Sequence, residues 1–429
     1  MSEPLLRGLA AGDPPSATGP VTGSADKVAD VLIVGGGLVG GTLACALAEK
    51  GVSVVVIDGE DPEALLAAGY DGRCSAIALA CQRLLATIGL WDLLGGESQP
   101  ILDIRVVDGG SPLFLHYAQA EAQGPMGYMV ENRLLRQAIL TRLGRLPAAT
   151  LLAPARMTAL RRDLDGVSAT LSDGQTVRAR LVVGADGRRS QVRESAGIGI
   201  RTLGYGQTAI VLTVEHERPH RGCAVEHFLP AGPFAILPMP GNRSSLVWTE
   251  RSDLVSGLLA LPAERFQAEL ERRFGDHLGW VRPVGPRFSY PLTLQAANRY
   301  VDRRLALVGD AAHGMHPVAG QGMNYGLRDV AVLAERLVVA QRLGLDPGAP
   351  ALLAEYEALR RPDNLLMLAI TDALVRLFSN DIAPVALARR LGIGAVERMG
   401  PLKRLFMRHA MGTLKLGPPP PRLMRGVPL

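Results

Sequence analysis

The stretch Asp30-Val31-Leu32-Ile33-Val34-Gly35-Gly36-Gly37-Leu38-Val39-Gly40 decides the fold of this chain. Its apolar half predicts a buried strand, and its glycines, spaced as GxGxxG, predict a tight turn that opens a helix. Gly35 allows the sharp turn, Gly37 lets the backbone approach a phosphate, and Gly40 lets the helix pack closely on the strand. The helix N-terminus then offers free N–H groups and a positive dipole end to a pyrophosphate.

An acidic residue completes this motif. A second predicted strand, residues 52–57, ends at Asp58, which lies about 20 residues beyond the glycines, as dinucleotide sites require. A carboxylate there can accept hydrogen bonds from an adenosine ribose, and it argues against a 2′-phosphate. A glycine-rich turn without a ligand would leave Asp58 unexplained. We therefore interpret the segment as one half of a dinucleotide site.

A second glycine-rich motif lies near the other end of the chain. It reads Gly309-Asp310-Ala311-Ala312-His313, followed by Pro317 and by Gly320-Gln321-Gly322-Met323-Asn324. Alone it would be an ordinary turn. Together, the two motifs are what bound FAD requires, because the first can hold the pyrophosphate and the second the ribityl chain and flavin ring.

Composition limits the class of protein. The 429 residues are 48% hydrophobic and 20% charged, which is enough for two globular domains. We expect residues 1–28 to form a disordered N-terminal tail, and no run of 18 apolar residues predicts a membrane span. The dispersed basic residues and 4% aromatic content argue against nucleic-acid binding. Four cysteines without CxxC spacing and few histidines predict a cytoplasmic protein without a metal site.

The order of strand and helix signals predicts an α/β fold. Strands and helices alternate through residues 30–100, whereas short β-rich runs broken by Gly and Pro fill residues 202–294. This pattern predicts a Rossmann-like FAD-binding domain with an inserted mixed or antiparallel β-sheet substrate domain and a C-terminal helical region. The expected boundaries are 29–102, 125–203 and 297–380 for the FAD-binding domain, 103–124 and 204–296 for the substrate domain, and 381–429 for a basic C-terminal helical segment and tail.

Further motifs carry a family resemblance. They are Asp71-Gly72-Arg73, Gly127-Tyr128-Met129-Val130-Glu131-Asn132-Arg133, Asp186-Gly187, Gly206-Gln207-Thr208-Ala209, Phe234-Ala235-Ile236-Leu237-Pro238 and Arg408-His409-Ala410-Met411-Gly412. With the two glycine motifs, they make the chain similar to class A FAD-dependent aromatic monooxygenases, the fold group of para-hydroxybenzoate hydroxylase. Over residues 29–412 it most resembles the ubiquinone-biosynthesis hydroxylase family.

The resemblance implies a set of cofactor-binding residues. Asp310 is expected to accept hydrogen bonds from ribityl hydroxyls, and the helix that starts at 320–324 to point N–H groups at the flavin N1–C2=O edge. Pro317, Gly320 and Gly322 form the expected catalytic flavin environment, with no acid or base assigned. The full set expected to bind FAD is Gly35, Gly37, Gly40, Asp58, Arg73, Glu131, Arg133, Asp186, Gly187, Asp310, Gly320, Gln321, Gly322, Met323 and Asn324.

The resemblance also implies a reaction. NAD(P)H would bind transiently and reduce the flavin, and a C4a-hydroperoxyflavin would hydroxylate the ring of a polyprenylated phenol, a quinone precursor. The protein must position the ring and exclude water. Phe234, Leu237 and Trp248 are candidates for the substrate pocket, although such residues are equally typical of a sheet core.

The last part of the chain, residues 389–429, is basic and partly apolar. It contains nine Lys or Arg residues and one acid, Glu397. This segment is either a solvated helix face with a Pro-rich tail or a surface that contacts a partner. Other ubiquinone-biosynthesis proteins and anionic lipid at the inner face of the membrane are the candidate partners.

Three other functions fit parts of the sequence. A hydroxylase of a small soluble aromatic compound would share the fold, and a reductase of prenyl double bonds would consume no O2. A non-catalytic FAD-binding scaffold of a quinone-biosynthesis complex would tolerate decay of the second glycine motif. That motif is intact here.

Overall fold

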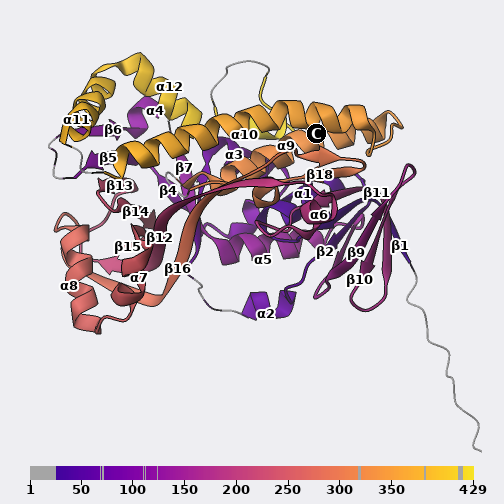
Figure 1. Cartoon of the computed structure of the whole chain (residues 1–429), viewed down its shortest axis with the longest axis horizontal. Helices are drawn as coiled ribbons and strands as arrows, with labels where there is room; N and C mark the ends of the chain where they lie inside the picture. Colours follow the sequence, from indigo (N-terminus) through magenta and orange to yellow (C-terminus); the bar gives the residue numbers. More distant parts are fainter. Residues whose placement is uncertain are drawn as a thin grey trace, which may run out of the picture.

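The computed structural model describes residues 26–67, 69, 72–109, 111, 113–122, 124–316, 320–380, 383–413 and 419–429. Within these residues the strands form three sheets. The two larger sheets lie beside each other, and long helices from the C-terminal third of the chain cover them (Figure 1). The longest of these helices extends over both sheets.

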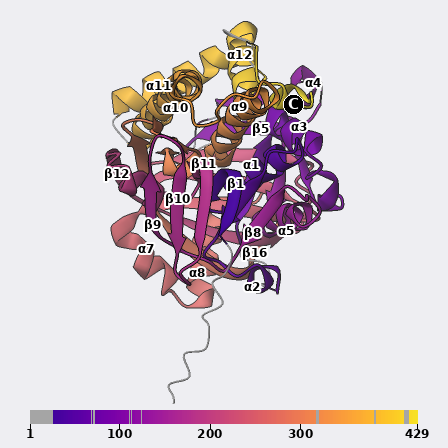
Figure 2. The same cartoon turned by 90° about the vertical axis from the view of Figure 1, so that its right-hand side faces the viewer.

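The nucleotide-binding domain is built on a mostly parallel sheet. Its elements are β1 (Lys27–Val34), α1 (Leu38–Ala48), β2 (Val54–Ile57), α2 (Pro62–Ala67), α3 (Leu79–Thr87), η1 (Asp92–Leu94), α5 (Asn132–Leu143), β8 (Ala149–Leu152), β9 (Met157–Arg162), β10 (Val167–Leu171), β11 (Thr176–Gly184), α6 (Gln191–Ser195), β17 (Val301–Asp302), β18 (Leu305–Leu307) and η2 (Gly309–Ala311). The strand order is β17-β18-β11-β1-β2-β8. Figure 2 shows β9 and β10 extending the sheet beside β11.

Strand β1 is central because it pairs in parallel with β11 on one side and with β2 on the other. Its residues Val31, Leu32 and Ile33 are completely buried, as expected for a strand covered on both faces. The carboxyl ends of β1, β2 and β11 therefore meet at one edge of the sheet, where α/β folds bind their ligands.

The second large sheet, which we call the substrate sheet after its predicted role, is mixed, with the strand order β19-β16-β12-β15-β14-β13-β5-β6. Its elements are β5 (Asp103–Asp108), β6 (Phe114–Tyr117), α4 (Gln119–Ala122), β12 (Ile200–His216), β13 (Cys223–Leu229), β14 (Gly232–Met239), β15 (Arg243–Arg251), α7 (Ser252–Leu259), α8 (Ala263–Phe274), β16 (Val281–Ala297) and β19 (His313–Gly314). Only the β13–β5 pair is parallel among the strand pairs described in this sheet. Helices α7 and α8 cover one face of the sheet (Figure 1).

A small third sheet joins the two domains. It contains β3 (Cys74–Ala78), β4 (Gln99–Ile101) and β7 (Gly127–Glu131), with β7 in the middle. Met129 of β7 is completely buried and packs with Ala224 and Met239 of the substrate sheet. This contact fixes the substrate sheet against the nucleotide-binding domain.

The C-terminal part is helical. Its elements are α9 (Gly322–Arg342), α10 (Pro350–Phe378), α11 (Ala383–Arg398), α12 (Gly400–Ala410) and η4 (Leu423–Arg425). Helix α10 continues through Pro362 without a break. After α12 the chain returns to the nucleotide-binding domain, where Leu423, Met424 and Leu429 are buried in the main core.

The structure confirms the α/β fold with an inserted mixed sheet and C-terminal helices, and it corrects two details. Strand β1 begins at Lys27, inside the tail expected for residues 1–28, most of which lies outside the described residues. Within the expected basic tail, η4 packs on α3 and α9, and Leu423, Met424 and Leu429 are buried in the main core, whereas Arg425 is exposed. Among the described helices, none has the length and apolar character needed to cross a bilayer.

Candidate active site

The first glycine-rich turn connects β1 to α1 as the sequence predicts. Gly35 has a φ of +102°, and a Cβ there would lie 2.4 Å from the carbonyl oxygen of Ala185. A Cβ on Gly40 would lie 1.9 Å from the carbonyl oxygen of Gly35, so α1 packs directly on the turn. Around Gly37, by contrast, no described atom would come within 4 Å of a Cβ. That open space beside the backbone fits a pyrophosphate.

The start of α1 is suited to an anion. Its N-cap is Gly37, no side chain caps the helix, and no acidic residue lies in its first turn. The first N–H groups are therefore available to a ligand, and the positive end of the helix dipole is not neutralised.

Asp58 lies directly beside this turn, at the end of β2. Its carboxylate accepts hydrogen bonds from the backbone N–H of Gly36, at 2.6 Å, and of Glu60, at 2.8 Å. A small hollow lies beside the turn and is lined by Gly36, Gly37, Asp58, Arg136 and Ala153, among others. The contact of Asp58 with an adenosine ribose stays a prediction.

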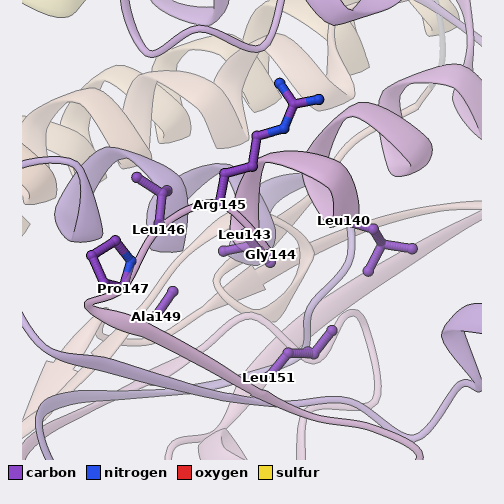
Figure 3. A pocket seen from close by; sticks show the side chains of 8 residues that line it. All are labelled: Leu140, Leu143, Gly144, Arg145, Leu146, Pro147, Ala149 and Leu151. Carbon is purple, nitrogen blue, oxygen red and sulfur yellow. The ribbon is translucent and has the colours of Figure 1, made fainter.

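A larger hollow adjoins the small one. It has a volume of about 440 Å³ and lies between the end of α5 and β8. Leu140 and Leu151 line both hollows. Figure 3 shows these two leucines on one side and Pro147 on the other, with the Arg145 side chain pointing away from Leu151. The larger hollow adjoins the Asp58 side of the first glycine turn, and its lining contains no residue of the second glycine motif.

The second glycine motif meets the first in space. A Cβ on Gly326 would lie 2.7 Å from the Val39 side chain, and one on Gly309, at a φ of +57°, would lie 3.3 Å from it. Helix α9 starts at Gly322 without a capping side chain or an acid in its first turn. The N-terminal turns of α1 and α9, from opposite ends of the sequence, therefore contact each other.

Asp186 and Asp310 follow two neighbouring strands, β11 and β18. Asp310 is half exposed and pairs with the Nε of Arg188 at 3.3 Å. Asp186 accepts a hydrogen bond from the N–H of Val192 at 3.1 Å, and burial raises its pKa. Arg193 is buried and donates to the carbonyl oxygens of Ala311, at 3.0 Å, and Arg188, at 2.9 Å. Arg193 thus ties the two acid-containing loops together.

A buried ionic network supports the second motif from behind. Asp329 of α9 accepts hydrogen bonds from His313 Nε2 at 2.6 Å, Arg360 Nε at 2.8 Å and the N–H of Gly309 at 3.0 Å. Burial by itself would raise the pKa of Asp329, but the charges and hydrogen bonds of His313 and Arg360 outweigh it and lower the pKa to about 2. Sequence reasoning missed Asp329 and Arg360. The signal for Asp329 in the sequence was its place directly before the apolar run 330–334.

Arg73, Glu131 and Arg133 lie at one end of the β3–β7 pair. Glu131 is buried and accepts a hydrogen bond from Arg133 Nε at 2.7 Å. Arg73 is exposed, and its carbonyl oxygen accepts a hydrogen bond from the N–H of Asn132. The arrangement places both predicted arginines close to the turn between β7 and α5.

Asn324 connects these residues to the second motif. Its side chain accepts a hydrogen bond from the N–H of Ala78, at 2.8 Å, and donates one to the carbonyl oxygen of Ala76, at 2.9 Å. A Cβ on Gly320 would lie 3.1 Å from that of Ala76. Asn324 therefore fastens the first turn of α9 to β3, beside partly buried Met323 and buried Gln321. Pro317 lies outside the described residues.

The three predicted pocket residues do not share one face of the sheet. Phe234 and Trp248 are buried beneath α8, where the Trp248 ring lies 5.7 Å from that of Phe266. Leu237 is on the opposite face, in a cluster with Met129 and Ala76. The two aromatic residues therefore belong to a core turned away from the glycine motifs, and of the three only Leu237 faces them.

The fold and the paired glycine turns define an FAD-binding flavoprotein. A sequence model described as "FAD binding domain" matches residues 28–368. The p-nitrophenol 4-monooxygenase PnpA from Pseudomonas putida has the same fold, with a TM-score of 0.77 at 20% identity over 91% of this chain and 100% of that one.

Curated relatives narrow the class to a family. The chain is 98% identical to the ubiquinone hydroxylase UbiL of Rhodospirillum rubrum over 429 residues, 100% of both chains. It is 39% identical to the 3-demethoxyubiquinol 3-hydroxylase of Escherichia coli, over 89% of this chain and 98% of that protein. It is 32% identical to the human mitochondrial ubiquinone biosynthesis monooxygenase COQ6, over 90% and 93%. The chain belongs to the ubiquinone hydroxylase family of FAD-dependent monooxygenases.

Proposed function

We propose that this protein uses NAD(P)H and O2 to hydroxylate the aromatic ring of a polyprenylated phenol in ubiquinone biosynthesis. The observation that carries the proposal is the meeting of the two glycine motifs through Val39, Gly309 and Gly326. This contact brings both ends of the chain together, which supports one extended FAD site. The similarity to named ubiquinone hydroxylases supports the substrate class.

The described residues fit FAD. The N–H groups of α1 would hold the pyrophosphate, Asp58 the adenosine ribose, and Asp310 the ribityl chain. The N-terminus of α9 would face the pyrimidine edge of the ring and stabilise negative charge there. Bound FAD supplies the redox and oxygen chemistry that side chains lack. The protein supplies position, electrostatics and exclusion of water.

NAD(P)H is expected to bind only transiently. The sequence contains a single complete GxGxxG following a strand, and that motif serves FAD. The nicotinamide cofactor would therefore have no dedicated dinucleotide fold, and it would leave once the flavin is reduced.

We further propose that α10–α12 contact the inner face of the membrane, where a prenylated precursor resides, or other ubiquinone-biosynthesis proteins gathered there. Large apolar side chains are exposed on these helices, among them Leu366, Leu391, Met399 and Phe406. Exposed arginines at 398, 404 and 408 lie among them. Mixed apolar and basic surfaces of this kind bind anionic lipid. Leu423, Met424 and Leu429 take no part in this surface because they are buried in the main core.

The test combines purified protein with cells lacking the gene. We expect the FAD-loaded protein to oxidise NAD(P)H, consume O2 and release a hydroxylated ring when given a prenylated phenol, with little coupled product from a water-soluble phenol. Cells lacking the gene should accumulate the unhydroxylated quinone precursor. Coupled hydroxylation of the soluble phenol alone, or normal quinone in the deletion strain, contradicts the proposed substrate. Product without O2 consumption contradicts the reaction type.

A further inference from the structure

An acid lies on the face of the substrate sheet that is turned away from α8, among residues that are mostly apolar. This acid is Glu226 of β13. Because side chains alternate along a strand, Glu226 shares its face with Ala224 and Phe228. In the register of the sheet it lies between Ala235 of β14 and Val106 of β5. The same transverse row continues through Val247 and Val211 to Phe288.

This face is turned toward the glycine motifs. Ala224 packs in a cluster with Ala76, the residue that lies against Gly320. At the far end of the row, the Phe288 ring lies 2.7 Å from where a Cβ on Gly72 would be, one residue before Arg73. The opposite face of the same strands forms the closed core beneath α8.

The end of helix α10 packs against this face of the sheet on its other side. Phe228, two residues after Glu226, stacks on Phe378 with ring centroids 4.1 Å apart. Tyr205 packs in the same cluster, and its ring meets that of His316 edge-on at 5.2 Å. Glu226 is thus placed between the flavin-binding loops on one side and the end of α10 on the other.

Glu226 makes no hydrogen bond or ion pair within the part of the chain that the structure describes. Its side chain keeps partial exposure, yet burial alone raises its pKa to about 7. Glu226 is therefore a desolvated acid on a packed face of the sheet. A desolvated acid without a partner is costly for folding, so such groups are concentrated at functional sites.

Other titratable groups at this face are either paired with another side chain or uncharged at neutral pH. Asp108 of β5 pairs with Arg389 at 2.8 Å, and Tyr205 donates to Asp372 at 3.0 Å. Burial raises the pKa of Tyr117 to about 12 and lowers that of His316 to about 4.

We propose that Glu226 binds the phenolic hydroxyl of the substrate, accepting its hydrogen bond and then its proton as the ring is hydroxylated. This assignment rests on the proposed function. The O–H bond of the phenol breaks, its proton goes to the Glu226 carboxylate, and its electron pair flows into the ring. A ring carbon then forms a bond to one atom of O2 and loses its hydrogen as a proton. The second oxygen atom leaves as water, with the two electrons supplied by NAD(P)H.

The chemistry explains why an acid suits this position. A phenol such as tyrosine has a pKa of about 10, and proton transfer is most efficient when the pKa of the base approaches both that of its partner and the working pH. An ordinary exposed glutamate is too weak a base. Burial brings Glu226 close to the useful range.

The test compares Glu226→Gln with Glu226→Asp and with Glu215→Gln, using the FAD-loaded protein and a prenylated phenol. Glu215 is an acid of the same sheet that pairs with Arg282 at 2.7 Å near the surface. We expect E226Q to retain FAD but to lose about 100-fold or more in the rate of ring hydroxylation. E226D should recover part of that rate, and E215Q should match the wild type.

The pH profile separates a base from a merely structural residue. Wild-type hydroxylation should rise with pH through about 7 as Glu226 ionises, and that limb should be missing in E226Q. Because the pKa of Glu226 is higher in the folded than in the unfolded state, wild-type stability should fall as the pH rises from about 4.5 to 7. E226Q should lack this loss and have an equal or higher melting temperature at pH 8.

Three results are decisive. If E226Q hydroxylates at the wild-type rate with the wild-type pH profile, Glu226 has no such role while the proposed function stands. If the wild type itself yields no hydroxylated ring, the proposed function fails first. If E226Q instead unfolds, or loses stability at pH 8, the acid is structural and the assignment is overturned.

Discussion

The dinucleotide end and the substrate sheet of this protein form their sites in different ways. At the dinucleotide end the backbone makes the site, because a Cβ on Gly40 would lie 1.9 Å from the oxygen of Gly35. On the substrate sheet the proposed site consists of side chains, and the two faces of the sheet differ. One face is a closed aromatic core around Trp248, and the other carries Leu237 and Glu226. Backbone constraints leave a motif in the sequence, whereas the choice of a sheet face does not.

The largest effect is expected at the glycine turn. Gly40→Ala forces a methyl group into backbone that cannot yield, so α1 must move off β1 and FAD binding should be lost. Gly37→Ala is the matched variant, because nothing described lies within 4 Å of its Cβ and its φ of −63° suits alanine. It should fold normally yet bind FAD about tenfold or more weakly, since the methyl group fills the space of the phosphate.

Bound flavin per protein and melting temperature measure both variants. Unchanged FAD affinity in Gly37→Ala, with the fold intact, would mean that the pyrophosphate lies elsewhere. Normal FAD content in Gly40→Ala would mean that FAD binding does not depend on the close packing of α1 against the turn.

The second prediction concerns the closed face of the substrate sheet. Trp248→Ala removes a completely buried ring that packs on Phe266 and lies beneath Arg273, whose guanidinium is 4.3 Å from the ring centroid. Unfolding free energy, measured by denaturant titration, should fall by about 3–5 kcal/mol. KM and FAD content should stay constant under conditions where the variant is folded. Trp248→Phe is the milder control, because the indole Nε1 has no hydrogen-bond partner within the described residues. A large rise in KM would place Trp248 in the substrate site after all.

The third prediction concerns His316, which connects the two regions. It lies between the two parts of the second glycine motif, and its ring packs on Tyr205 of the substrate sheet. Burial, and to a smaller extent the charge of Arg188, lower its pKa from 6.5 to about 4. Between about pH 4 and 6.5, His316 is therefore neutral in the folded protein and protonated in the unfolded chain. Stability is complete above pH 6.5 and is lost as the pH falls from 6.5 toward 4.

This loss amounts to about 3 kcal/mol at most over that pH range. Unfolding free energy measured at several pH values should show a smaller slope between pH 6.5 and 4 in His316→Gln than in the wild type. Equal slopes for the two proteins would mean that His316 is charged in the folded state, and that the boundary between the regions is more polar than the structure indicates.

The same comparison explains what could be predicted from sequence. The turn at Gly35–Gly40 and Asp58 were predictable because their spacing is local and each glycine has a steric reason. Asp329 and Glu226 were not, because their roles depend on contacts between distant segments. Strand β13 reads Cys-Ala-Val-Glu-His-Phe-Leu, without alternation of polar and apolar residues, so only its pairing with β14 and β5 shows which face Glu226 joins. For the same reason Phe234 and Trp248 could not be separated from Leu237.

The smallest effect is expected for Leu237→Ala on the open face. Leu237 is only partly buried and packs at the edge of the cluster that contains Ala76 and Met129. Its truncation should cost less stability than that of Trp248, roughly 1–2 kcal/mol. If a prenylated phenol lies against this face, KM should rise by about fivefold, equivalent to roughly 1 kcal/mol of lost apolar contact, with kcat little changed. Steady-state kinetics with the FAD-loaded variant would measure both constants. A KM that matches the wild type would move the substrate away from Leu237 and toward the end of the sheet where Phe228 meets α10.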